Sequence, residues 1–252
     1  MFAYGQIGHC VVHDSSVPAV GSPRISGAFP LLHTAILARF GDTSDTDDSD
    51  LVVDIRDATH LSMATLYNFW DSDRIVLPWS QLTRLGLQIV FWFSIRGCFL
   101  SVFHLCPNLI QCTLQDTSGT SDLDLLSPGL YKHPKLKELF VSGCVHNVYG
   151  TLTFPSLRYM HIEDCQGVDP ELLEFIARSG ELKCLDLGSC GDTSLLVLTL
   201  LPALSHITDL MLDCSKSDAN LFTVFFGLLG GVVPTCPKLE TLEISDTVRM
   251  WR

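Results

Sequence analysis

Three stretches of the chain share one spacing of apolar residues: LKELFVSGC at residues 136–144, LRYMHIEDC at 157–165 and LKCLDLGSC at 182–190. Each has apolar residues at its first, fourth and sixth positions and a cysteine at its ninth. Because alternate side chains of a β-strand point to the same face, the fourth and sixth residues point together into a core. Each stretch therefore predicts a short strand that turns in from a preceding loop.

The apolar half of this pattern recurs along the chain with a mean step of about 26 residues, which is typical of leucine-rich repeats. In five copies a proline stands two residues before the first apolar residue, where it ends the preceding segment. We therefore predict short parallel strands that overlap residues 32–37, 61–66, 82–87, 109–114, 136–141, 157–162, 182–187, 207–212 and 239–244.

The segments between the copies predict helices. Asp169 and Pro170 suit the cap and the first position of a helix that runs towards Ser179. Further helices are expected at residues 99–105, 191–201 and 218–229. Together the elements predict an α/β fold: a right-handed leucine-rich-repeat solenoid (horseshoe) of about nine irregular repeats, with parallel strands on the concave face and helices on the convex face. We expect this domain over residues 25–252, after an irregular N-terminal segment at residues 1–24.

The amino-acid sequence of the repeats resembles that of one protein family. The spacing C-P-x-L-x-x-L-x-L-x-x-C resembles the cysteine-containing leucine-rich repeats of F-box proteins. More specifically, the chain resembles the repeat region of F-box-like proteins from mushroom-forming fungi over about residues 25–252, in the phrases FPLLHTAIL (29–37), LPWSQLTRLGL (77–87), CPNLIQCTL (106–114), FPSLRYMHIEDC (154–165) and CPKLETLEISD (236–246).

This resemblance implies a protein-protein interaction module, the substrate-recognition part of a ubiquitin-ligase receptor. In that family the repeats capture a protein, and a separate N-terminal F-box docks a Skp1-like adaptor. Residues 1–24 are too few for the three-helix F-box and lack its L-P-x-E-like start. We therefore expect the Skp1-like adaptor as a partner only if an F-box exists upstream.

The charge balance, the apolar runs and the cysteine spacing argue against nucleic acids and membranes as partners and bear on the cellular location. The 28 acidic residues against 16 Lys and Arg give a net charge of −12, which argues against nucleic-acid binding. The apolar residues 85–106 have Arg96 at their middle, which costs about 2.5–3.5 kcal/mol in a bilayer, and the apolar run 221–233 is too short to span one. The ten cysteines include no C-x-x-C pair, so zinc-ribbon and thioredoxin-like spacings are absent, and we expect the thiols to be in a reducing compartment. We expect no membrane contact and a cytoplasmic or nuclear location.

No motif predicts catalysis, a metal site or a cofactor. The nine histidines have no H-x-x-x-H spacing, and neither G-x-S-x-G nor a phosphate-binding loop is present. The acidic run DTSDTDDSD at residues 42–50 lacks the glycine and glutamate of a calcium loop, so a solvated loop is expected. His161 and Cys165 lie four residues apart, and the sequence indicates no third group that would make them a catalytic pair. We expect a protein that is not an enzyme, with Cys144, Cys165 and Cys190 in structural roles.

The residues that alternate with the buried positions should line the concave face. There the first four repeats carry one charge, Arg84, whereas the last five carry six carboxylates and no Lys or Arg. Such a face attracts a basic partner, and aromatic residues anchor it. We expect a protein with a basic segment to bind Glu138, Phe140, Tyr159, His161, Glu163, Asp186, Asp209, Met211, Asp213 and Glu243.

Three alternatives stand beside this hypothesis. The face could be merely solvated, as on any acidic protein. The repeats could form a small-molecule sensor, which requires a deep pocket with convergent polar groups. They could also form a free-standing leucine-rich-repeat scaffold without a ligase link.

Overall fold

The computed structural model describes residues 2–6, 9–15, 24–27, 29–40, 52–67, 75–89, 103–116, 131–143, 149–150, 152–163, 170–188, 200–213, 227 and 236–245. The chain divides into two compact units, Met1–Thr113 and Leu114–Arg252, which we term the first and second units. Both units are built from parallel strands that follow one another along the chain. The fold is therefore a parallel β-solenoid, which agrees with the predicted solenoid architecture.

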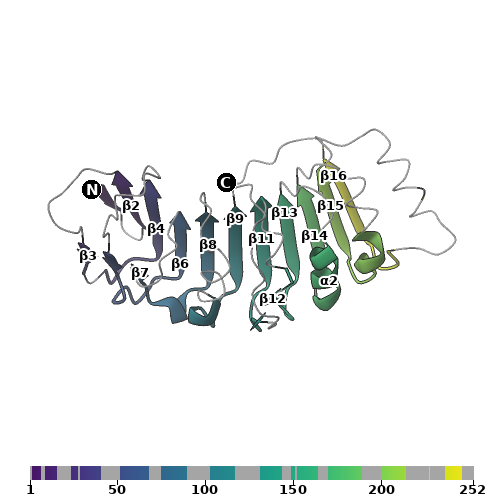
Figure 1. Ribbon diagram of the computed structural model, residues 1–252, viewed down its shortest axis with the longest axis horizontal. Coiled ribbons are helices and arrows are strands. Elements are labelled where there is room, and N and C mark those ends of the chain that lie inside the picture. The colour runs from purple at the N-terminus through teal and green to yellow at the C-terminus, as the bar shows by residue number, and fades with distance from the viewer. Residues whose placement is uncertain are drawn as a thin grey trace. The chain divides into compact units, whose positions relative to one another are not determined.

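The strands of the first unit pair in chain order. β1 and β2 are antiparallel, and each later pair from β2 to β8 is parallel (Figure 1). Where the sequence predicted an irregular segment at residues 1–24, the structure has β1 and β2. The strands are β1 (Phe2–Gln6), β2 (His9–Ser15), β4 (Thr34–Phe40), β6 (Met63–Tyr67), β8 (Arg84–Ile89) and β9 (Gln111–Asp116), of which only the first three residues of β9 belong to this unit.

The second unit has a sheet whose described pairs β11–β13, β13–β14, β14–β15 and β15–β16 are all parallel. In Figure 1 these strands lie side by side and point the same way. They are β11 (Glu138–Gly143), β13 (Tyr159–Glu163), β14 (Cys184–Gly188), β15 (Asp209–Asp213) and β16 (Thr241–Ser245). Together with β4 to β9, they overlap every segment for which a strand was predicted.

Each predicted segment begins with a turn, and its strand starts two residues later. The first apolar residue closes that turn: the N–H of Leu157 donates to the carbonyl of Phe154 at 3.1 Å, and that of Leu182 donates to Ser179 at 2.9 Å. The next residues join the neighbouring repeat, since the N–H groups of Arg158 and Tyr159 both donate to the carbonyl of Lys137. The leucine spacing thus sets both the turn and the start of pairing.

The core of the second unit includes two ladders of apolar side chains across its sheet. Leu139, Met160, Leu185 and Leu210 form one ladder, and Val141, Ile162, Leu187 and Leu212 form the other. All eight are at most 2% exposed, as predicted. The prediction was wrong for Leu242 and Ile244 of β16, which are partly exposed. Among the described strands β16 pairs only with β15, so its side chains have packed neighbours on one side.

The returns between the strands differ from the prediction. The helix expected after Asp169 is confirmed as α2 (Pro170–Arg178), and residues 103–105 of the second expected helix are helical. Most of residues 191–201 and 218–229 lies outside the described part of the chain. Elsewhere the described returns are short parallel strands and 3-10 turns: β3 (Arg24–Ser26), β5 (Val52–Asp54), β7 (Ile75–Val76), η2 (Trp79–Gln81), β10 (Tyr131–Lys132), β12 (Leu152–Thr153) and η4 (Leu201–Leu204).

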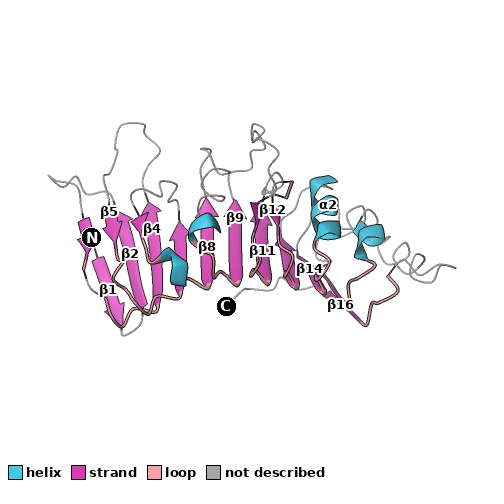
Figure 2. Ribbon diagram, turned by 90° about the horizontal axis from the view of Figure 1, so that it is seen from below, coloured by secondary structure: helices cyan, strands magenta, loops and turns pink. Residues whose placement is uncertain are grey.

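Helix α2 covers one side of the strands in the second unit (Figure 2). It is amphipathic: Leu172, Phe175 and Ile176 are buried, while Glu174 lies on its exposed side. The rings of Tyr149 and Phe154 pack on Phe175 with centroid distances of 5.5 and 5.7 Å. This apolar contact fixes the outer layer against the sheet.

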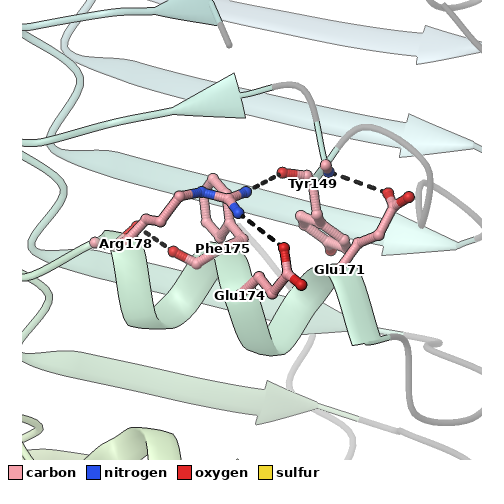
Figure 3. A network of polar contacts seen from close by, with 7 residues as sticks. Tyr149, Glu171, Glu174, Phe175 and Arg178 are labelled. Carbon is pink, nitrogen blue, oxygen red and sulfur yellow. Dashed lines mark hydrogen bonds and ion pairs between the residues drawn. The ribbon is translucent and has the colours of Figure 1, made fainter. Parts of the chain in front are cut away.

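Polar contacts also hold α2 to residues 149–150 (Figure 3). The Arg178 guanidinium donates to the carbonyl of Tyr149 at 2.8 Å and pairs with Glu174 at 3.3 Å. At the other end of the helix, the Gly150 N–H donates to the Glu171 carboxylate at 3.1 Å. A Cβ atom at Gly150 would lie 2.6 Å from that carboxylate, so a larger residue would displace the Glu171 side chain from this contact. These contacts have a structural role on the side opposite the predicted binding residues.

Candidate protein-binding face

The ten residues predicted to bind a protein all lie in the second unit, on the side of the sheet opposite the leucine ladders. We term this surface the polar face and define it by the side chains that alternate with the core in β11 to β16. The strand register arranges them in rows across the sheet. One row is Phe140, His161, Asp186, Met211 and Glu243; a second is Glu138, Tyr159, Cys184, Asp209 and Thr241.

Three aromatic rings meet at one end of the polar face. The ring centroids of Phe140 and Tyr159 are 5.3 Å apart with an interplanar angle of 46°. Those of Phe140 and His161 are 6.2 Å apart at 42°. Phe140 and Tyr159 are partly exposed, whereas His161 is 6% exposed. Aromatic contacts in this distance range are favourable, so the rings form a fixed apolar cluster.

Asp186 lies beneath this cluster and is 4% exposed. Its Oδ2 accepts a hydrogen bond from the Tyr159 hydroxyl at 3.1 Å, and the Nδ1 of His161 lies 3.1 Å from the same oxygen. Asp186 was expected to be an open charge on the face. The structure instead has it covered by its neighbours, in the position of an internal acceptor that orients Tyr159 and His161.

Gly188 makes room for the buried histidine. A Cβ atom at this position would lie 3.0 Å from Cε1 of His161 and 3.8 Å from Cγ of Glu163. Contacts as short as 3.0 Å require the neighbour to shift, and a ring packed among other side chains has little room to do so. Gly188 is the last residue of β14, and no role for it was predicted from the repeat pattern.

The other carboxylates of the polar face differ in exposure. Glu138, Glu163 and Asp209 are partly exposed and Glu243 is exposed, whereas Asp213 is 7% exposed. The Thr208 hydroxyl donates to Asp209 at 2.6 Å. The described strands carry no Lys or Arg on this face. Four accessible carboxylates therefore remain, two of them on the strands that also hold the aromatic rings.

A row of cations borders the polar face, and the sequence analysis missed it. Lys137, Arg158 and Lys183 are exposed and occupy the second position of three successive repeats, just before β11, β13 and β14. Reading that position down the aligned repeats would have found them. Exposed cations therefore stand immediately before three of the strands that carry the polar face.

The four cysteines whose side chains the structure describes, Cys106, Cys112, Cys184 and Cys236, are buried or partly buried. Burial raises the pKa of the Cys184 thiol to about 11, and the carboxylates of Asp209 and Asp186 add to this effect. Burial likewise raises the pKa of Cys106 to about 12. Cys106 and Cys236 are both buried in the core. Because a thiolate is the reactive form, these thiols are poor nucleophiles near neutral pH.

Several predicted features lie outside the described residues: the acidic run 42–50 and the repeat cysteines Cys144, Cys165 and Cys190. Within the described part of the chain, no group of three or more His, Cys, Asp or Glu side chains could hold a metal ion. None of the helices described there has the length and apolar character that a membrane crossing requires.

Comparison of the chain with protein-family models, with curated proteins and with solved structures finds no match.

Proposed function

We propose that the second unit is a protein-interaction module whose polar face binds a basic segment of a partner protein. One observation carries the proposal: two partly exposed rings, Phe140 and Tyr159, lie on a strand surface with four accessible carboxylates and no cation among its described residues. Aromatic residues dominate binding energy at protein interfaces. Charges of one sign steer an oppositely charged partner.

A second part of the proposal concerns the protein family to which the solenoid belongs. We propose that it is a leucine-rich-repeat solenoid of the cysteine-containing class, non-catalytic and intracellular, that works as the substrate-recognition part of an F-box-type ligase receptor. The repeat spacing and the nine strands that overlap it support the first part. Co-purification of the full gene product with a Skp1-like adaptor tests the second part, and a product that never associates with the adaptor contradicts it.

Charge neutralisation on the polar face tests the binding function. The variant Glu163→Gln, Asp209→Asn, Glu243→Gln removes three accessible carboxylates without changing the core. Exposed charge pairs contribute about 0.2–1 kcal/mol each, so affinity for a short peptide rich in Lys and Arg should fall by about 3- to 100-fold. Binding by the native protein should also weaken as the salt concentration rises from about 0.1 M to about 1 M, because the distance over which charges interact in solution, the Debye length, falls from about 10 Å to about 3 Å.

A matched control separates the polar face from overall acidity. The variant Asp57→Asn, Glu174→Gln, Glu181→Gln removes the same charge from three exposed positions off that face. It should retain native affinity for the peptide. Equal losses in the two variants, or no peptide binding by the native protein, would contradict the proposed function.

A further inference from the structure

We infer that the aromatic end of the polar face is a binding site for an arginine side chain, formed by Phe140, Tyr159, Glu138 and Glu163, with Asp186 as a positioning residue. This inference rests on the proposed function and specifies the partner's anchor. It distinguishes arginine from lysine, which net charge alone does not do.

The ring pair suits a flat cation. Phe140 and Tyr159 contact each other at 5.3 Å and are tilted by 46°, so their faces form an angled surface on adjacent strands. A guanidinium placed within about 6 Å of a ring centroid is attracted by the ring's negative face. Both rings are partly exposed, whereas the third ring, His161, is buried beneath the surface.

Carboxylates flank the rings along the strands. Register places Glu138 directly opposite Tyr159, and Glu163 lies on the same strand as Tyr159 and His161. Residues two apart on a strand are separated by about 6.6 Å, so Glu138 is within one long side chain of both rings. Glu163 is two residues from His161, the register partner of Phe140, and therefore lies diagonally across from Phe140. Arginine stacks on a ring while its remaining N–H groups pair with carboxylates in a planar fork. Lysine has a compact ammonium that cannot do both as well.

Buried contacts fix the site before binding. The hydrogen bond from the Tyr159 hydroxyl to Asp186 sets the direction of the Tyr159 side chain. His161 contacts the same oxygen, and its ring fits in the space that Gly188 leaves. A surface that is already ordered loses less conformational entropy when a partner binds. Asp186 therefore acts through Tyr159 and is not itself a contact for the guanidinium.

The test compares three glycine-spaced peptides that carry arginine, lysine or uncharged citrulline at the same positions. Cation–π contacts at exposed sites contribute about 0.5–1 kcal/mol, so the native protein should bind the arginine peptide about 2- to 5-fold more tightly than the lysine peptide. It should bind the citrulline peptide most weakly. Equal affinity for arginine and lysine peptides overturns the arginine site but leaves the proposed function intact. Absence of binding to both overturns the two together.

Variants assign the preference to the rings. Phe140→Leu keeps an apolar side chain and should remove the arginine preference while salt-dependent binding of both peptides persists. Phe29→Leu changes a partly exposed phenylalanine of the first unit and should leave the preference unchanged. A preference that survives Phe140→Leu overturns the proposal.

Asp186 is tested by the ratio of the two affinities. Asp186→Asn removes charge but keeps an acceptor for the Tyr159 hydroxyl, so the arginine preference should survive. Tyr159→Phe keeps the ring but removes the hydrogen bond, so the preference should fall. If Asp186→Asn abolished the preference and Tyr159→Phe preserved it, Asp186 would act by charge and the positioning role would be overturned.

Discussion

The two units use one backbone pattern to display different surfaces. In both, the repeat strands begin at the third position of the repeat and, except in β16, bury the fourth and sixth side chains. On the other side of the strands, the first unit presents mainly small or uncharged residues such as Thr65, Gly86 and Gln88, whereas the second presents carboxylates around a ring cluster. The difference shows that the leucine spacing determines the strands, and that the alternate positions are free to determine what binds.

The largest expected effect is loss of a ladder leucine. Leu185→Ala should lower the free energy of unfolding by about 2–5 kcal/mol, because Leu185 is fully buried between neighbouring strands. Leu85→Ala in the first unit should cost a similar amount, since both units use the same core position. Leu242→Ala should cost clearly less, because Leu242 is partly exposed. Urea unfolding followed by circular dichroism gives these values, and equal costs for Leu185 and Leu242 would contradict the packing described for β16.

Two matched glycines sharpen the comparison next. A Cβ atom would lie 3.0 Å from a neighbouring side chain at both Gly86 and Gly188. At Gly188 the neighbour is the buried His161 ring, so Gly188→Ala should destabilise by about 1–3 kcal/mol. At Gly86 it is the partly exposed Thr65, which can move, and alanine recovers about 0.4–1 kcal/mol of chain entropy. Thermal unfolding should therefore rank Gly188→Ala well below Gly86→Ala, and the reverse order would show that His161 is not confined.

The exposed cations Lys137, Arg158 and Lys183 provide a test in which affinity should rise and not fall. Lys183→Glu removes a repulsive charge beside the polar face, so affinity for a basic peptide should rise by about 2- to 5-fold. Arg84→Glu makes the same kind of change in the first unit and should leave affinity unchanged. A titration of the peptide into each variant measures both effects. Equal gains would mean that the peptide responds to net charge and not to the second unit's face.

The smallest expected effect is a dependence of stability on pH. Burial lowers the pKa of His206 below 6.5, Lys238 adds to the lowering, and a backbone hydrogen bond with Ser179 partly opposes it. The folded state favours the neutral form of a histidine whose pKa it lowers. The contribution of His206 to stability is therefore fully present above pH 6.5 and is lost as pH falls through the folded-state pKa. Unfolding of native and His206→Gln proteins across this range should show a shallower acid decline in the variant. Parallel curves would remove His206 as the cause.

The sequence predicted the strands well because the apolar spacing is long-range and repeated. It did not predict the short outer strands such as β7 and β12, since two residues are too few to show a period. The alternation of apolar and polar residues also assigned each polar side chain to the correct face of the sheet. It did not predict how deeply each of those side chains is buried. Asp186 is buried because Tyr159 and His161 converge on it from the adjacent strand, and such cross-strand packing is absent from a linear pattern.

Backbone amide chemical shifts, recorded while a glycine-spaced arginine peptide is titrated into the protein, test the central claim most directly. The account predicts that the shifts change first and most at Phe140, Tyr159 and Glu163 of β11 and β13, and that the strands of the first unit do not respond. Changes that concentrate in the first unit, or along α2 and residues 149–150, would contradict the polar face as the binding surface.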